Sequence, residues 1–141
     1  MIAVDTNILV YAHREELPLH EKAKAQIIEL AESPEPWALP VFCITEFIRV
    51  VTHPKLFDPP SALPDVLDAI GSLLESPSLI ILNPGENLWR MLNEITKKTN
   101  TRGNLLFDAQ IAAVCKEHGI KDLLSEDRDF ARFDCIMLHS L

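Results

Sequence analysis

Short apolar runs alternate along this chain with longer amphipathic stretches, and this alternation constrains the fold more than any other feature. The short runs predict strands, and the amphipathic stretches predict helices. We expect strands at residues 1–4, 37–39, 79–82, 121–125 and 135–138, helices at 7–13, 21–32, 41–52, 61–74, 86–99 and 105–118, and a helical turn at 129–133. This order indicates an α/β fold with a mainly parallel sheet flanked by helices.

Length and composition are those of one domain. The chain has 141 residues, of which 48% are hydrophobic and 24% are charged, so we expect residues 1–141 to form a single domain. No apolar stretch reaches membrane-spanning length and the N-terminal segment lacks a basic start, which favours a cytoplasmic protein. The three scattered cysteines, Cys43, Cys115 and Cys135, predict free thiols, with the first two in the core.

Four acidic residues occupy positions that solubility alone does not explain. Asp5 directly follows the first apolar run, and Asp127 comes just after another. Glu46 and Asp108 lie within otherwise apolar helical segments. Ligands of parallel α/β sheets bind outside the carboxyl ends of the strands, where Asp5 and Asp127 would lie. Glu46 and Asp108 would reach the same edge from neighbouring helices.

Helical spacing supports an inward orientation for Asp108. It shares one helix face with three apolar residues, Ile111, Ala112 and Cys115. The spacing is less decisive for Glu46, because Arg49 follows it by three residues and an ion pair within the helix would explain both. We therefore expect Asp108 to point toward the rim of the core and leave the role of Arg49 open.

Each acid also has a purely structural explanation. Asp5 would serve as a helix N-cap, Asp108 would interact with the positive end of its own helix, and Asp127 would cap the turn that follows it. Taken singly, these explanations are the better ones. Four caps need not share one edge of a sheet, however, so the four acids together favour a functional site.

Clustered carboxylates point to a divalent cation. They repel one another and raise each other's pKa values, and a bound cation removes that penalty. Mg²⁺ and Mn²⁺ prefer oxygen ligands, polarise phosphate oxygens and lower the pKa of water, which is sufficient chemistry for phosphodiester hydrolysis. The net charge of −8 alone disfavours nucleic-acid binding, but bound cations would offset the clustered acids.

At these acids the sequence resembles the PIN-domain family, in particular its VapC-type toxins, over nearly its whole length. Four segments carry the resemblance: Val4–Ala12 with Asp5-Thr6-Asn7, Thr45–Val50 around Glu46, Gly103–Ala109 around Asp108, and Ser125–Phe130 with Asp127. Ser125 stands where the family usually has Thr, and it keeps the hydroxyl group. Any one motif is weak, but four in the right order are a strong signal.

The resemblance implies a PIN-like fold and a site for Mg²⁺ or Mn²⁺. By it, the metal would be bound and water activated by Asp5, Glu46, Asp108 and Asp127. The residues that orient these carboxylates would be Thr6, Asn7 and Ser125. Asp129 is close enough to Asp127 to compete for the fourth position, although we expect Asp129 to cap the turn at Phe130.

The resemblance also implies an activity and partners. VapC-type toxins are endoribonucleases that cut RNA to leave a 5′-phosphate and a 3′-hydroxyl. They usually form homodimers, and a small VapB-type antitoxin occludes the acidic site. An RNA substrate, an antitoxin and a second copy of the chain are therefore the expected partners.

Three arginines are candidates for contacts with the phosphate backbone: Arg49, Arg102 and Arg128. For Arg49 the pairing with Glu46 is an equally good explanation. We interpret Lys116 as a solvated surface charge. The five histidines share no spacing typical of metal ligands.

Two tryptophans, Trp37 and Trp89, are expected in the core or in an interface. The apolar helices between Ser61 and Thr99 are expected to contribute to the dimer interface or the antitoxin groove.

Other classes of protein fit less well. A signalling receiver domain needs paired acids near its first strand and a late lysine, and a haloacid-dehalogenase-like phosphatase needs Asp-x-Asp where this chain has Asp5-Thr6-Asn7. A non-catalytic PIN scaffold that binds RNA or protein is the main alternative, but degenerate members lose acids and this chain carries all four. A nuclease directed at DNA also stays open, because net charge does not distinguish the nucleic acids.

Overall fold

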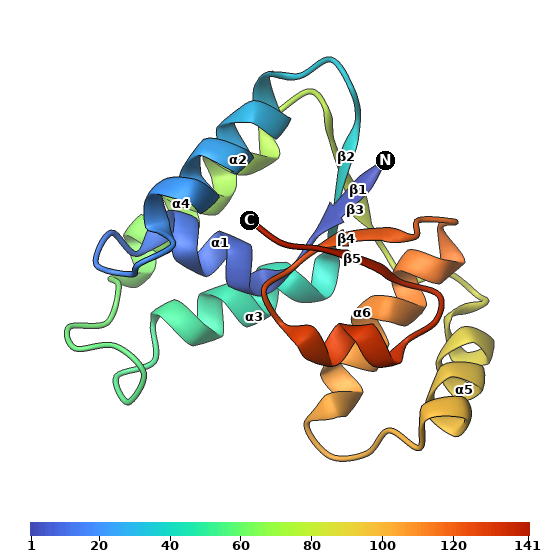
Figure 1. The fold of residues 1–141 in the computed structure, drawn as a ribbon. Helices are drawn as coiled ribbons and strands as arrows, with labels where there is room; N and C mark the ends of the chain where they lie inside the picture. The colour runs from blue at the N-terminus through green and yellow to red at the C-terminus, as the bar shows by residue number, and fades with distance from the viewer.

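A computed structural model describes residues 1–141 and contains one five-stranded sheet (Figure 1). The strands are β1 (Ile2–Val4), β2 (Trp37–Pro40), β3 (Leu79–Leu82), β4 (Asp122–Leu124) and β5 (Met137–His139). Their order across the sheet is β3-β2-β1-β4-β5, and every neighbouring pair is parallel. The α/β prediction is confirmed, with a sheet that is entirely parallel.

The helices are α1 (Thr6–His13), α2 (His20–Glu32), α3 (Val41–Val51), α4 (Leu63–Leu74), α5 (Leu88–Thr99), α6 (Leu105–Glu117) and the 3-10 helix η1 (Arg128–Arg132). Every predicted element is present, and each end lies within two residues of its predicted position. Pro64 lies in the first turn of α4, where proline is tolerated. Gly119 follows α6 with a φ of 72°, a left-handed conformation that glycine adopts without a steric penalty.

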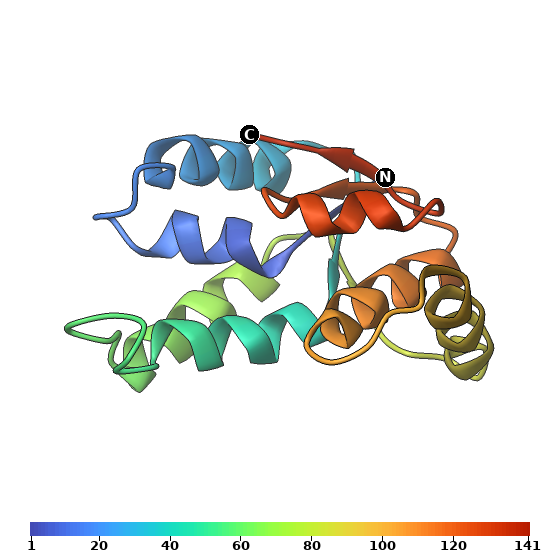
Figure 2. The same ribbon diagram turned by 60° about the horizontal axis from the view of Figure 1, so that its bottom comes forward.

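The helices form two groups around the sheet. Helix α1 packs against α2 and α3, and α3 also contacts α4. Helix α6 packs against α5 and η1, and it meets α3 at one end (Figure 2). None of the helices is long and apolar enough to cross a membrane. The packing leaves α1, α3 and α6 around the carboxyl ends of the central strands.

The core lies between the sheet and these helices. Residues of β1 and β2 are almost wholly buried, which explains why their sequences are continuously apolar. Trp37, Cys43 and Cys115 are in this core as predicted, and all three cysteines are free thiols. Trp89 is 72% exposed on α5, so its assignment to the core is wrong and only the interface expectation remains.

Candidate active site

The strand order changes direction between β1 and β4, because β2 and β3 lie on one side of β1 and β4 and β5 lie on the other. Asp5, the first of the predicted acids, lies at this point. The two strands pair in parallel with Val4 opposite Leu124, so the residues that follow them leave the sheet side by side. Asp5 follows β1 and Ser125 follows β4. The Ser125 hydroxyl donates a hydrogen bond of 2.6 Å to Oδ2 of Asp5. Such a switch point is where α/β sheets bind their ligands.

The Ser125 hydroxyl is the centre of a small hydrogen-bond network. Its oxygen accepts hydrogen bonds from the Asn7 amide nitrogen and from the backbone N–H of Asp127, each at 3.0 Å. With both bonds accepted, its own proton is directed to Asp5. The other oxygen of Asp5, Oδ1, accepts from the backbone N–H of Thr6 at 2.7 Å. Asp5 is therefore the N-cap of α1 and a fixed member of the site at once.

Two further acids arrive from the helices. Glu46 lies on α3, and its Oε2 accepts a hydrogen bond of 2.9 Å from the Thr6 hydroxyl. Asp108 lies in the first turn of α6 and is half-buried. Thr6 and Ser125 each contact a carboxylate, and Asn7 contacts the Ser125 hydroxyl. Their role in orienting metal ligands stays a prediction.

All four predicted acids border one pocket. It has a volume of about 210 Å³ and is lined by Asp5, Thr6, Asn7, Val10, Tyr11, Glu46, Val50, Asp108 and Asp127. No basic side chain is among the lining residues. The structure therefore brings together the acids that the sequence placed on four separate segments, and we call this space the acid pocket.

A fifth acid, Asp129, lies at the same place. Carboxylate oxygens of Asp108, Asp127 and Asp129 lie within 4.8 Å of one another. The expectation that Asp129 caps the turn is wrong, because the cap of η1 is Asp127, whose Oδ1 accepts from the backbone N–H of Asp129 at 2.9 Å. The capping bond ties up one oxygen of Asp127, whereas the side chain of Asp129 is exposed at the start of η1.

Burial and mutual repulsion weaken two of these acids. Burial raises the pKa of Asp5 to about 6, although hydrogen bonds from Ser125 and Thr6 act in the opposite direction. Burial, and then the nearby negative charge of Asp127, raise the pKa of Asp108 to about 7. The acid pocket thus offers only oxygen donors and an unfavourable concentration of negative charge. This is the donor set that Mg²⁺ or Mn²⁺ requires, so the residues fit such a cation.

Comparison with known proteins identifies the family. A model of the PIN domain matches residues 2–135. The chain belongs to the PIN-domain family. This PIN domain is 38% identical over 133 residues to the VapC ribonuclease Mb2897 of Mycobacterium bovis and to ribonuclease VapC43 of Mycobacterium tuberculosis. The alignment covers 94% of this chain and 90% of each relative.

Solved structures confirm the PIN-like fold. VapBC2 from Rickettsia felis, bound to a DNA fragment from its promoter, superposes with a TM-score of 0.72 at 17% identity and covers 100% of this chain and 99% of its own. VapC20 of Mycobacterium tuberculosis, a toxin that cleaves the sarcin-ricin loop, superposes with a TM-score of 0.69 at 18% identity, with 93% of each chain covered.

The basic residues of this PIN domain lie outside the acid pocket. Arg49 approaches Glu46 to 3.7 Å, which is the helical ion pair anticipated from their spacing. Arg102 and Arg128 are exposed and do not border the acid pocket. Lys116 lies 3.4 Å from Glu94 at the surface, as expected of a solvated charge. The phosphate-binding role of the three arginines stays a prediction.

Sequence reasoning missed four residues of the site. Val10 and Tyr11 line the acid pocket one helical turn after Asn7, and Val50 lies one turn after Glu46. Spacings of three and four residues from the named motif residues would have found them. Cys43 was predicted only as a core residue, yet its thiol lies 4.0 Å from Oδ1 of Asp5 and donates to it.

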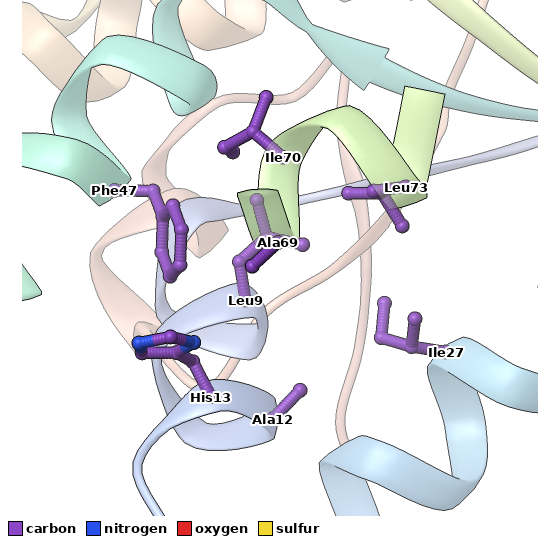
Figure 3. Close-up of a pocket in the computed structure, with 8 residues that line it drawn as sticks. All are labelled: Leu9, Ala12, His13, Ile27, Phe47, Ala69, Ile70 and Leu73. Carbon is purple, nitrogen blue, oxygen red and sulfur yellow. The ribbon is translucent and has the colours of Figure 1, made fainter. Parts of the chain in front are cut away.

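A separate apolar cleft is lined by residues of α1 that do not border the acid pocket, and Figure 3 shows its lining side chains. It has a volume of about 130 Å³ and is lined by residues from four helices: Leu9, Ala12, His13, Ile27, Phe47, Ala69, Ile70 and Leu73. His13 is the one polar residue among them, and its ring meets that of Phe47 edge-on at 5.4 Å. The cleft contains no acid, so its chemistry differs from that of the acid pocket.

Proposed function

We propose that this PIN domain is an endoribonuclease that depends on Mg²⁺ or Mn²⁺ and acts as the toxin of a toxin–antitoxin pair. The observation that carries the proposal is the convergence of Asp5, Glu46, Asp108 and Asp127 on one pocket at the carboxyl edge of the sheet. Relatives that are 38% identical over most of the chain are named ribonucleases, which supports RNA as the substrate. An RNA substrate in turn favours the cytoplasm as its location.

The carboxylates would hold the cation, with Asp127 or Asp129 as the fourth acid. When bound, Mg²⁺ or Mn²⁺ polarises the phosphate and lowers the pKa of water, so that hydrolysis needs no protein nucleophile. The chain's own contribution is to fix the oxygen donors. Ser125 and Thr6 donate to the two oxygens of Asp5, and Thr6 also donates to Glu46, so both carboxylates are oriented before any ligand arrives.

The partners are also proposals. Solved relatives include toxin–antitoxin complexes such as VapBC2, which supports an antitoxin partner for this chain. The apolar cleft between α1, α2, α3 and α4 is the candidate binding site for an apolar antitoxin segment. Helix α4 also exposes Leu63, Leu67 and Leu74 to solvent, so a partner would bury more apolar surface than the cleft alone offers. We further propose a homodimer, which the mass of the purified protein in solution would test.

The nuclease is tested by incubating the antitoxin-free protein with total cellular RNA in Mg²⁺ or Mn²⁺. An EDTA sample and the variants Asp5→Asn and Asp108→Asn should leave the RNA intact. Asp68→Asn is the matched control, because it removes the same charge from an exposed residue of α4 that does not line the acid pocket. It should cleave like the wild type. Single-stranded and duplex DNA, tested in parallel, examine the DNA-directed alternative.

Each outcome discriminates between the candidate functions. Discrete fragments that require the metal and disappear in both site variants would support the proposal. RNA that is bound but left intact by the wild type in both metals would favour the non-catalytic scaffold. Equal cleavage by the wild type and the site variants would mean that the carboxylates do not carry the activity.

A further inference from the structure

We propose that the groove between α3 and α6, beside the acid pocket, is a subsite for one unstacked nucleobase of a single-stranded RNA. The inference rests on the ribonuclease function proposed above and adds a part of the substrate that the acids do not contact. The groove has a volume of about 360 Å³ and is lined by Phe42, Thr45, Glu46, Arg49, Phe107, Gln110 and Ile111. We call it the base groove.

Two helix faces form the base groove. Phe42, Thr45 and Arg49 recur on α3 at spacings of three and four residues, so they lie along one face of that helix. Phe107, Gln110 and Ile111 have the same spacing on α6. The two helices contact each other, and these faces therefore meet across the groove.

The base groove borders the acid pocket. Glu46 lines both spaces. On the opposite helix, Phe107 lines the groove and its neighbour in sequence, Asp108, lines the acid pocket. A phosphate held at the acids would therefore leave the next base of the strand beside the aromatic ring of Phe107.

The groove walls offer the chemistry that a base uses. The side chain of Phe107 is 60% exposed although it is a large apolar ring, so it is free to stack. Aromatic side chains recognise single-stranded RNA by such stacking, and polar groups around the ring read the edge of the base. Thr45 and Gln110 supply a hydroxyl and an amide, and Arg49, the one basic residue that lines the groove, could contact a backbone phosphate.

The surface around the base groove is less suited to bind a second copy of the chain than to bind a base. A stable protein interface buries roughly 800 Å² on each partner around an apolar centre. Large exposed hydrophobic residues are absent from α3, and on α6 they are limited to Leu106 and Phe107. A groove with one exposed ring and several polar groups matches a base in chemistry.

Binding of short RNA tests the base groove. Fluorescein-labelled single-stranded U and A oligonucleotides of about 12 nucleotides are titrated in Ca²⁺, which takes oxygen ligands as Mg²⁺ does. Phe107→Ala and Phe107→Leu should weaken binding by about 5- to 150-fold, the contribution of one stacked base. Phe107→Trp should bind at least as tightly as the wild type. Leu106→Ala is the control, since Leu106 is 43% exposed next to Phe107 but does not line the groove.

Sedimentation of the same proteins, and cleavage of total RNA in Mg²⁺, complete the test. The proposal is supported if Phe107→Ala loses RNA affinity while its mass in solution stays that of the wild type. It is overturned if wild-type protein binds RNA and Phe107→Ala or Phe107→Leu binds equally well. It is also overturned if Phe107→Ala changes the oligomeric state, because the groove then joins two copies. A wild type that neither binds nor cuts RNA would overturn the proposed function and this inference together.

Discussion

Replacement of Ser125 by alanine tests whether the network around Asp5 orders the acid pocket. Ser125 is 1% exposed, and its hydroxyl donates the one hydrogen bond that Oδ2 of Asp5 accepts. A hydrogen bond to a charged group contributes about 1.5–3 kcal/mol, and the Asn7 amide and the Asp127 backbone N–H each lose an acceptor. We therefore expect Ser125→Ala to lower the free energy of unfolding of the metal-free protein by about 2–4 kcal/mol near pH 8.

The loss of unfolding free energy in Ser125→Ala should be larger at high pH than at low pH. The Ser125 hydroxyl favours ionised Asp5, so its removal raises the pKa of Asp5 above the value of about 6 in the wild type. The folded variant then binds more protons than the folded wild type at neutral pH. The difference in stability between the two proteins is complete well above pH 6 and shrinks as the pH falls through about 6, where Asp5 becomes protonated in both.

Urea denaturation in EDTA at about pH 5 and about pH 8 measures both quantities. Ser125→Thr, which keeps the hydroxyl, should stay close to the wild type. Ser140→Ala removes an exposed hydroxyl and should change stability little at either pH. A variant Ser125→Ala that unfolds within about 0.5 kcal/mol of the wild type near pH 8 would refute the idea that this hydroxyl holds Asp5. So would a large loss that is the same at both pH values.

Four further outcomes are expected. Because Asp5 and Asp108 have raised pKa values, the folded protein binds more protons than the unfolded chain between about pH 4 and about pH 7. The metal-free protein should therefore lose stability as the pH rises through this range, and scanning calorimetry in EDTA would show a falling Tm. Added Mg²⁺ should raise the Tm near pH 8 more than near pH 5. The variant Asp108→Asn should be more stable than the wild type near pH 8 without metal, and Mg²⁺ should raise its Tm much less. Gly85→Ala should destabilise the fold by about 1–2 kcal/mol, since a Cβ there would lie 2.8 Å from Oε2 of Glu117 and displace a carboxylate that accepts hydrogen bonds from the backbone N–H groups of Gly85 and Asn87. A double-mutant cycle with Glu117→Ala should recover part of this loss. Trp37→Phe should cost clearly less than the roughly 3–5 kcal/mol of a truncation to alanine in urea denaturation, because the buried indole N–H of Trp37 has no partner to lose.

The sequence predicted the parts of the site that follow directly from strand ends and helix faces. Asp5 was assigned because it interrupts an apolar run, and the register of β1 against β4 then places it beside Ser125. Asp108 was assigned because its helix face is otherwise apolar. These are local patterns with a fixed geometric consequence, and the structure brings the residues to one pocket as expected.

The remaining errors concern contacts that local patterns do not determine. Whether Asp127 or Asp129 caps η1 depends on where a five-residue 3-10 helix begins, and a shift of two residues exchanges their roles. The approach of Cys43 to Asp5 depends on how α3 packs against α1, which is a tertiary contact between segments 38 residues apart. Trp89 follows Leu88 on an amphipathic helix, but it lies beside the apolar face rather than on it and is 72% exposed.

The electrostatics of the acid pocket explain why a chain with a net charge of −8 is compatible with a polyanionic substrate. The pocket lacks a basic residue, so the metal-free protein would repel a phosphate there. Burial first, and then the neighbouring negative charges, raise the pKa values of Asp5 and Asp108, so ionising these two acids costs stability in the metal-free protein. A bound divalent cation would reduce this cost and make the local potential less negative, so stability and phosphate affinity should rise together with metal concentration. The metal Kd fitted from the rise of Tm near pH 8 should therefore agree with the metal concentration that gives half of the gain in RNA affinity, with Ca²⁺ used in both titrations so that the RNA is not cut. Values that differ by more than tenfold would show that the acids that cause the instability are not those that recruit the phosphate.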